Sequence, residues 1–142
     1  SDNLYSTKAI EMLKSESICN SMIAYNSDCL NFNDEKISSF SILEIKNNFL
    51  SKIIEKPDID LIKTIDNKKF VSMNIFSFFG NQIYEYLRDC EINEYRGEKE
   101  IASAIQNMVN DKKESIKIFK ICEHVPDLTL KDDIQLIKSF LK

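Results

Sequence analysis

The stretch VSMNIFSFFGNQIYEYLRDC, residues 71–90, dominates the predicted fold because it concentrates large apolar side chains. Most of them crowd one side of a helical wheel, yet Met73 and Phe78 fall well outside that side. A helix that is apolar on most of its sides is usually buried on most of them. We therefore predict a central buried helix at 72–90.

Apolar residues spaced three and four apart recur along the rest of the chain, which predicts helices throughout. A long helix is expected to follow Asp34, which can cap it, and to run to about Lys56, where Pro57 ends it. A further apolar face spans residues 98–110, and whether 98–125 forms one helix or two stays open. Glycine and proline number only 2 each, too few for the many turns of an all-β fold. The expected fold is all-α: a single compact bundle of six to eight helices forming one domain, residues 1–142.

The four cysteines, Cys19, Cys29, Cys90 and Cys122, show no closely spaced pair, which argues against a structural zinc site. A chain of 142 residues buries enough surface to fold without disulfides or metals. Four unpaired thiols are typical of a reducing compartment, so the sequence predicts a cytoplasmic protein.

Net charge is −4 and evenly spread, with two arginines and no tryptophan. Phosphate neutralisation and base stacking lack their usual side chains, so no nucleic-acid partner is expected. Because no apolar run approaches 18 residues, no membrane span is expected either.

No motif for catalysis or cofactor binding is apparent. Two glycines cannot build a phosphate-cradling loop, and a single histidine, His124, excludes histidine triads and multi-histidine metal sites. The acidic clusters at 91–100 and 127–133 are interpreted as solvated charges rather than as acid–base pairs or cation ligands. The sequence thus predicts a protein that is not an enzyme and has no catalytic, cofactor-binding or metal-binding residue.

The pair Cys122–His124 is the strongest chemical alternative, since a neighbouring base can activate a thiolate. On a helix, however, positions two apart do not face each other. We interpret the pair as a helix end, with Cys122 in the core and Pro126 stopping the helix. An enzyme that uses Cys122 or the carboxylates at 91–100 remains an alternative.

Four amphipathic residues are the candidate protein-binding site. Tyr84 and Arg88 lie four positions apart, opposite the apolar side of the expected central helix, and Tyr95 and Arg96 lie in the adjoining loop. Tyrosine and arginine are enriched at the hot spots of protein interfaces.

The tail FKICEHVPDLTLKDDIQLIKSFLK, residues 119–142, resembles the last two helices of poxvirus immunomodulators with a Bcl-2-like fold. The preceding EIASAIQNMVND, residues 100–111, is loosely similar to the helix before them. The chain is also rich in Ile, Lys, Asn, Ser and Asp, which suggests an AT-rich genome such as that of a large DNA virus. The resemblance implies a non-enzymatic protein that binds host signalling or cell-death proteins, often as a homodimer.

The expected function is therefore a non-enzymatic protein–protein interaction module. On the resemblance it is a viral inhibitor of host innate immune or apoptotic signalling, located in the host cytoplasm. The alternative is an acidic bacterial immunity or antitoxin protein that binds and blocks a toxin, since a net charge of −4 suits a cationic partner. Affinity capture from host cells would test the first; a neighbouring toxin gene would favour the second.

Overall fold

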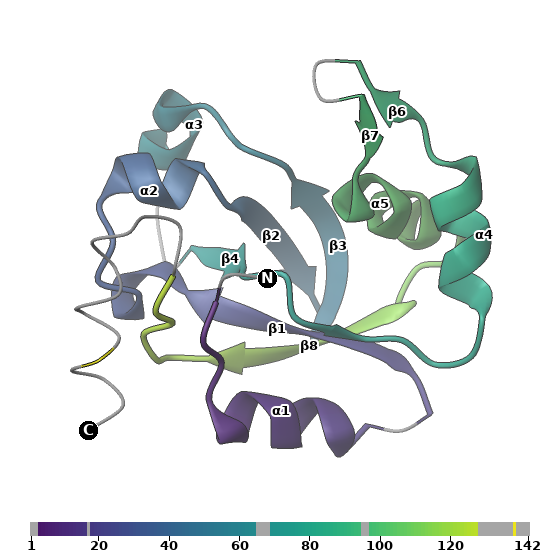
Figure 1. Cartoon of the computed structure of the whole chain (residues 1–142), viewed down its shortest axis with the longest axis horizontal. Helices are drawn as coiled ribbons and strands as arrows, with labels where there is room; N and C mark the ends of the chain where they lie inside the picture. Colours follow the sequence, from purple (N-terminus) through teal and green to yellow (C-terminus); the bar gives the residue numbers. More distant parts are fainter. Residues whose placement is uncertain (1–2, 17, 65–68, 95–96, 128–137, 139–142) are drawn as a thin grey trace.

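A five-stranded, barrel-like β-sheet forms the centre of the molecule, with helices packed around it (Figure 1). The computed structural model describes residues 3–16, 18–64, 69–94, 97–127 and 138. In chain order the elements are α1 (Thr7–Lys14), β1 (Asn20–Asn26), the 3-10 helix η1 (Ser27–Cys29), α2 (Asp34–Ser38), β2 (Ser41–Lys46), β3 (Phe49–Ile54), α3 (Ile59–Thr64), β4 (Phe70–Ser72), β5 (Phe76–Ser77), α4 (Gln82–Asp89), β6 (Ile92–Asn93), β7 (Glu98–Lys99), α5 (Ile101–Asp111) and β8 (Ile116–Ile121). The fold is mixed α/β, so the prediction of an all-α, Bcl-2-like helical bundle is wrong.

The barrel follows the strand order β4-β2-β3-β8-β1, and it closes because β4 also pairs with β1. Strands β1 and β8 are parallel, in register from Asn20↔Ile116 to Tyr25↔Ile121. The remaining pairs are antiparallel. Beyond β4, β5 continues along the same side of β1.

The region 34–56, expected to be one long helix, consists of the short helix α2 followed by the β2–β3 hairpin. Asn33, not Asp34, caps α2, because its side chain accepts a hydrogen bond of 2.8 Å from the Lys36 amide. Asn47 and Asn48 form the hairpin turn with φ values of 53° and 64°. Two consecutive positive φ values define a type I′ turn, and asparagine tolerates them better than most residues.

The predicted central helix at 72–90 is also wrong. Only its last part, α4, is helical; β4 and β5 precede it, and Gly80 turns the chain with a φ of 67°. The segment is apolar on many sides of a helical wheel because its side chains alternate between two cores. Val71 and Met73 enter one core, whereas Phe76 and Phe78 pack against the other.

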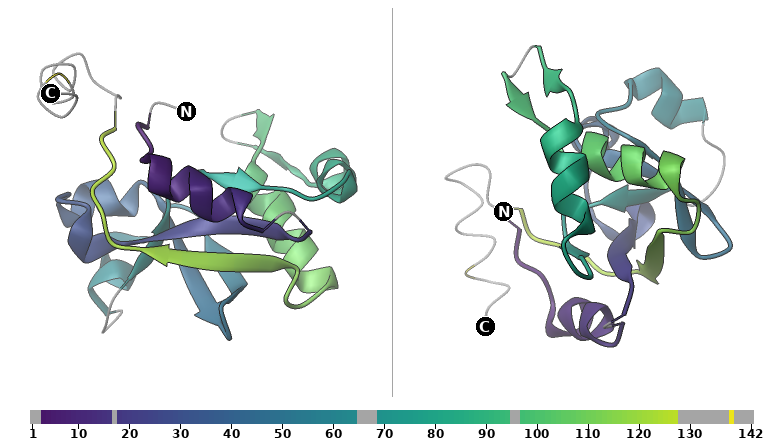
Figure 2. Two further views of the ribbon diagram at one scale, coloured as in Figure 1. Left: turned by 90° about the horizontal axis from the view of Figure 1, so that it is seen from below. Right: turned by 90° about the vertical axis from the view of Figure 1, so that its right-hand side faces the viewer.

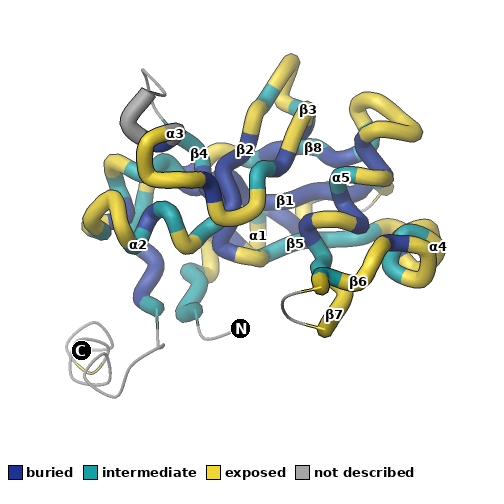
Figure 3. The backbone as a smooth tube through the Cα atoms, turned by 90° about the horizontal axis from the view of Figure 1, so that it is seen from above, coloured by how far each residue is buried: buried dark blue, intermediate teal, exposed yellow. Residues whose placement is uncertain are grey.

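Two hydrophobic cores lie on the two faces of β1. Met22 and Ala24 belong to a core shared with α5, while Ile23 and Tyr25 belong to a core shared with α1, α2 and α3. This alternation is the period of two expected for a strand buried on both faces. Figure 2 shows α1 on one side of β1 and β8 and α5 on the other, and Figure 3 shows the buried strands enclosed by more exposed helices.

The predicted helix at 98–110 is confirmed in position as α5, which starts at Ile101 and buries Ala104, Ile105, Met108 and Val109. The residues after it form β8, so 98–125 is neither one helix nor two. Residues 128–137 and 139–142, which hold the expected last helix, lie outside the described residues. The resemblance to the immunomodulator family stays a prediction, but the fold that it implied is wrong.

A disulfide joins Cys29 to Cys122, with the two Cα atoms 5.3 Å apart. Cys122 therefore follows a strand and is bonded, so its interpretation as an unpaired core thiol at a helix end is wrong. Cys19 and Cys90 are free thiols. The expectation of four unpaired thiols, from which a reducing compartment was inferred, does not hold. Within the described residues, no helix is long and apolar enough to cross a membrane.

Candidate functional site at one end of the barrel

Polar side chains gather at the end of the barrel where β2 begins and where β3 and β4 end. Ser41 pairs with Ser72 across β2 and β4, and Ile42 pairs with Ile54 across β2 and β3. Ser41 and Ser72 are 5% and 2% exposed, which makes them two of the few buried polar residues described. We call the group Lys36, Ser41, Glu55, Lys56, Ser72 and Asp127 the polar end.

Glu55 and Lys56 follow β3 directly and are both exposed. The Ser41 hydroxyl donates a hydrogen bond to the Glu55 carboxylate, which fixes that carboxylate at the rim of the barrel. Lys56 has a φ of 42° and precedes Pro57. Lysine disfavours positive φ, and a residue before proline favours an extended backbone, so this conformation is strained on two counts. Such strain is found preferentially at functional sites.

A second non-glycine residue with positive φ lies close by. Asn74, with a φ of 58°, donates its backbone N–H to the Ser72 hydroxyl at 3.2 Å. The carbonyl of the intervening Met73 accepts hydrogen bonds from the Tyr5 hydroxyl and the Asn3 amide. The N-terminal segment therefore holds this turn in place.

Lys36 and Asp127 form an ion pair at the same end, with side chains 34% and 9% exposed. The Lys36 ammonium also lies 6.0 Å from the ring centroid of Phe32 and 5.7 Å from that of Phe40, within the range of cation–π attraction. Asp127 forms an isolated β-bridge with Asn3. Contacts thus connect α2, the N-terminal segment and the residues after β8.

His124 lies in the same segment but not beside a thiolate. Its ring Nδ1 contacts the Leu30 carbonyl, and its ring meets Phe32 edge-on with centroids 5.2 Å apart. Because Cys122 is in the disulfide, the pair cannot act as a nucleophile and its base. Together the disulfide, the histidine contacts and the Lys36–Asp127 pair hold residues 122–127 against η1 and α2.

The polar end offers groups suited to a phosphorylated polyol. A carboxylate such as that of Glu55 accepts hydrogen bonds from hydroxyl groups, and an ammonium such as that of Lys56 pairs with phosphate. In the described part of the chain, no group of three His, Cys, Asp or Glu side chains could hold a metal ion.

The candidate protein-binding residues lie elsewhere, on and after α4. Tyr84 is 65% exposed, and Arg88 donates two hydrogen bonds to Asp89, at 2.7 and 2.8 Å. These hydrogen bonds lower the pKa of Asp89 and raise that of Arg88. Tyr95 and Arg96 lie outside the described residues. Protein binding by these four residues stays a prediction.

Sequence reasoning missed the polar end. Pro57 is predicted to end a helix, whereas in the structure it follows the end of strand β3. Ser41 and Ser72 lie 31 positions apart with no local motif, so only the β2–β4 pairing brings them together. Asp127 pairs with Lys36 and is therefore more than a solvated charge.

The described architecture is similar to that of solved nucleotidyltransferases and pyrophosphorylases. A protein of Bacillus anthracis assigned as a glucose-1-phosphate thymidylyltransferase, in complex with sucrose, is 16% identical with a TM-score of 0.62, over 98% of this chain and 51% of that one. A UTP-bound UGPase of Acinetobacter baumannii is 14% identical with a TM-score of 0.60. The match covers 98% of this chain and 48% of that one. A UDP-glucose pyrophosphorylase complexed with UDP-glucose is 14% identical with a TM-score of 0.67. The match covers 99% of this chain and 53% of that one.

At such identities the likeness shows a shared fold. The chain spans about half the length of each of these three proteins. No protein-family model matches the chain, and no curated protein matches it. The sequence predicts that this protein is not an enzyme. Its fold is nevertheless similar to that of proteins named as a thymidylyltransferase and as pyrophosphorylases.

Proposed function

We propose that this chain binds a phosphorylated sugar or a nucleotide sugar at the polar end of its barrel. The observation on which the proposal rests is the strained Lys56 next to Glu55, whose carboxylate a buried serine holds in place. Support comes from the fold, because solved structures with a similar fold hold UTP, UDP-glucose or sucrose. The proposal concerns binding, since the activities of those proteins belong to chains about twice as long.

Each residue has a distinct role in this proposal. The Glu55 carboxylate accepts hydrogen bonds from sugar hydroxyl groups, and the Ser41 hydroxyl fixes its orientation. The Lys56 ammonium pairs with the phosphate as a point charge. The left-handed backbone at Lys56 is a strained conformation of the kind that is found preferentially at functional sites. Lys36 and Asp127 are positioning residues that hold the neighbouring segments together.

Isothermal titration calorimetry with glucose 1-phosphate and UDP-glucose tests the proposal. The expected result is saturable binding that Lys56→Ala weakens about tenfold or more, the usual effect of losing one charge-assisted contact. Glu55→Gln should weaken the binding of both ligands by a similar factor but leave inorganic phosphate unaffected. The matched control is Lys52→Ala, because Lys52 is an exposed lysine on β3 that forms an ion pair of 4.0 Å with the exposed Glu44.

Two outcomes would contradict the proposal. One is the absence of heat for both ligands at millimolar concentration. The other is equal affinity in the Lys52→Ala and Lys56→Ala variants. Because both lysines are exposed, neither substitution is expected to change the free energy of unfolding through lost burial, and circular dichroism of both variants checks this.

A further inference from the structure

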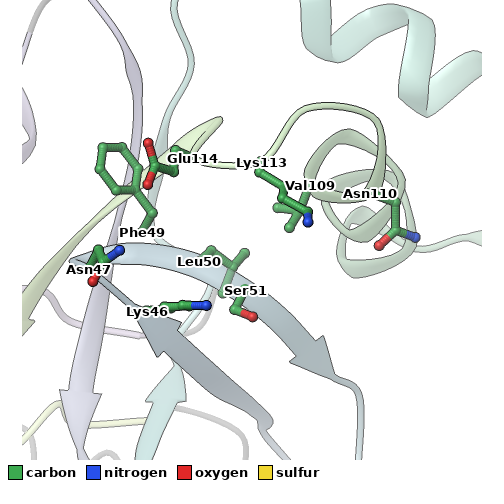
Figure 4. A pocket seen from close by; sticks show the side chains of 9 residues that line it. All are labelled: Lys46, Asn47, Phe49, Leu50, Ser51, Val109, Asn110, Lys113 and Glu114. Carbon is green, nitrogen blue, oxygen red and sulfur yellow. The ribbon is translucent and has the colours of Figure 1, made fainter.

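We propose that a hollow beside the β2–β3 turn is a second binding site, which takes a small organic anion with an apolar part. The hollow has a volume of ≈ 420 Å³ and lies between the start of β3 and the end of α5 (Figure 4). It is far along β3 from the polar end, because Glu55 follows the opposite terminus of that strand. The lining residues of this hairpin hollow are Lys46, Asn47, Phe49, Leu50, Ser51, Val109, Asn110, Lys113 and Glu114.

Two ammonium groups give the hollow its charge. Lys46 lines it from the end of β2 and Lys113 from the turn between α5 and β8. In Figure 4 the Lys113 side chain extends into the space between β3 and α5, and the Lys46 side chain lies beside Ser51. Neither forms an ion pair or hydrogen bond with a described residue. The one carboxylate of the lining, Glu114, lies beside the Phe49 ring in Figure 4 rather than between the two lysines. Two ammonium groups in the lining of one hollow, neither paired with a described residue, attract an anion in a protein whose overall charge is −4.

The floor of the hollow is apolar. Leu50 and Val109 are 2% and 5% exposed and belong to the core shared by the barrel and α5. Asn110 accepts a hydrogen bond from Gln106 through its side-chain oxygen at 2.8 Å, which leaves its amide nitrogen available to donate. An apolar floor with a few convergent polar groups is the usual composition of a small-molecule site, and a volume of ≈ 420 Å³ is within the usual range.

The walls of the hollow are held in place before any ligand arrives. The Asn47–Asn48 turn is tied to β8, because the Asn48 carbonyl accepts a hydrogen bond of 2.8 Å from Ile118 N–H. Phe49 pairs with Lys117 across β3 and β8. Lys117 is itself paired with Glu16 at 2.7 Å, so its charge does not enter the hollow. A ligand therefore meets a site whose backbone needs little ordering, which favours affinity.

Phenyl phosphate is a suitable probe, with inorganic phosphate and benzyl alcohol as its anionic and apolar halves. Amide chemical shifts recorded by NMR during titration locate the binding site and give its dissociation constant. We expect phenyl phosphate to shift the amides of 46–51 and 109–114 and to bind about tenfold more tightly than either half. Lys46→Ala and Lys113→Ala should each weaken binding by about tenfold. Lys8→Ala, at an exposed lysine on α1, should leave it unchanged.

The inference is overturned if benzyl alcohol binds as well as phenyl phosphate, or if the Lys46→Ala/Lys113→Ala double variant keeps full affinity. It is also overturned if the shifted amides lie elsewhere, including at Glu55 and Lys56. Repeating the titration with the Lys56→Ala variant separates the two proposals, because loss of sugar-phosphate binding at the polar end should leave the hairpin hollow unaffected. Lys46 and Lys113 are both exposed, so their substitution by alanine is not expected to unfold the protein and confound the result.

Discussion

At the scale of single residues, Tyr25 is the most unusual side chain of the core. It is fully buried, and its hydroxyl has no hydrogen-bond partner in the described part of the structure. Burial raises the pKa of Tyr25, and the nearby Glu123 and Tyr5 raise it further. A buried hydroxyl without a partner costs free energy relative to the same ring without it.

Tyr25→Phe should therefore raise the free energy of unfolding by about 1 kcal/mol at neutral pH. The pH dependence has a definite sign. Because the folded-state pKa is raised, the unfolded chain releases this proton first, and stability falls as the pH rises above about 10. The phenylalanine variant lacks this contribution, so its alkaline loss of stability should be smaller. Urea unfolding between pH 7 and pH 11 measures both effects.

Tyr84→Phe is the matched control, since Tyr84 is 65% exposed and should change stability by less than about 0.5 kcal/mol. A Tyr25→Phe variant that is less stable than the parent by about 1 kcal/mol or more would contradict this prediction, because it would mean that the hydroxyl is hydrogen-bonded in the folded protein.

At the scale of elements, α5 completes the barrel where two strands diverge. Strands β3 and β8 are paired only at Phe49↔Lys117. Further along β3, the Gln106 side chain accepts a hydrogen bond of 2.8 Å from the Ile53 N–H, which would otherwise face the helix without a partner. The position and apolar face of α5 were predictable from local spacing alone. The role of Gln106 was not, because in the sequence it is simply a polar residue on a helix.

Gln106→Leu should lower the free energy of unfolding by about 1–3 kcal/mol, because it leaves the Ile53 N–H unsatisfied beneath α5. Chemical denaturation measures the change, and amide hydrogen exchange at Ile53 should become faster. Gln82→Leu, at an exposed position in the first turn of α4, controls for the substitution itself. Equal stability of the two variants would show that α5 does not complete the strand edge through this side chain.

At the scale of the whole molecule, the Cys29–Cys122 disulfide joins segments separated by 93 residues. It links η1, which follows β1, to the end of β8, which is parallel to β1. A cross-link that closes so long a loop restricts the unfolded chain strongly. It also holds residues 122–127 near α2, where Asp127 pairs with Lys36 at the polar end.

We expect two thiols, those of Cys19 and Cys90, to react with a chromogenic thiol reagent in denaturant without reductant, and four after reduction. In the folded protein Cys19 should react slowly at neutral pH, because burial and then Glu16 raise its pKa. Cys122→Ser should lower the free energy of unfolding by about 2–5 kcal/mol. Cys19→Ser is the control for this substitution, because it leaves the disulfide intact. Four reactive thiols in denaturant before reduction would contradict the Cys29–Cys122 disulfide.

The sequence by itself determined the elements that local interactions can stabilise. Helix α1 begins at its Ser6 cap, and helix α5 follows its apolar spacing. Tertiary structure alone decided the strands, the disulfide and the polar end. A strand obtains its hydrogen bonds from remote partners, so a short apolar run such as residues 71–78 does not show whether it will form a helix or a strand. For the same reason Ser41, Glu55 and Ser72 become neighbours only once β2, β3 and β4 have paired.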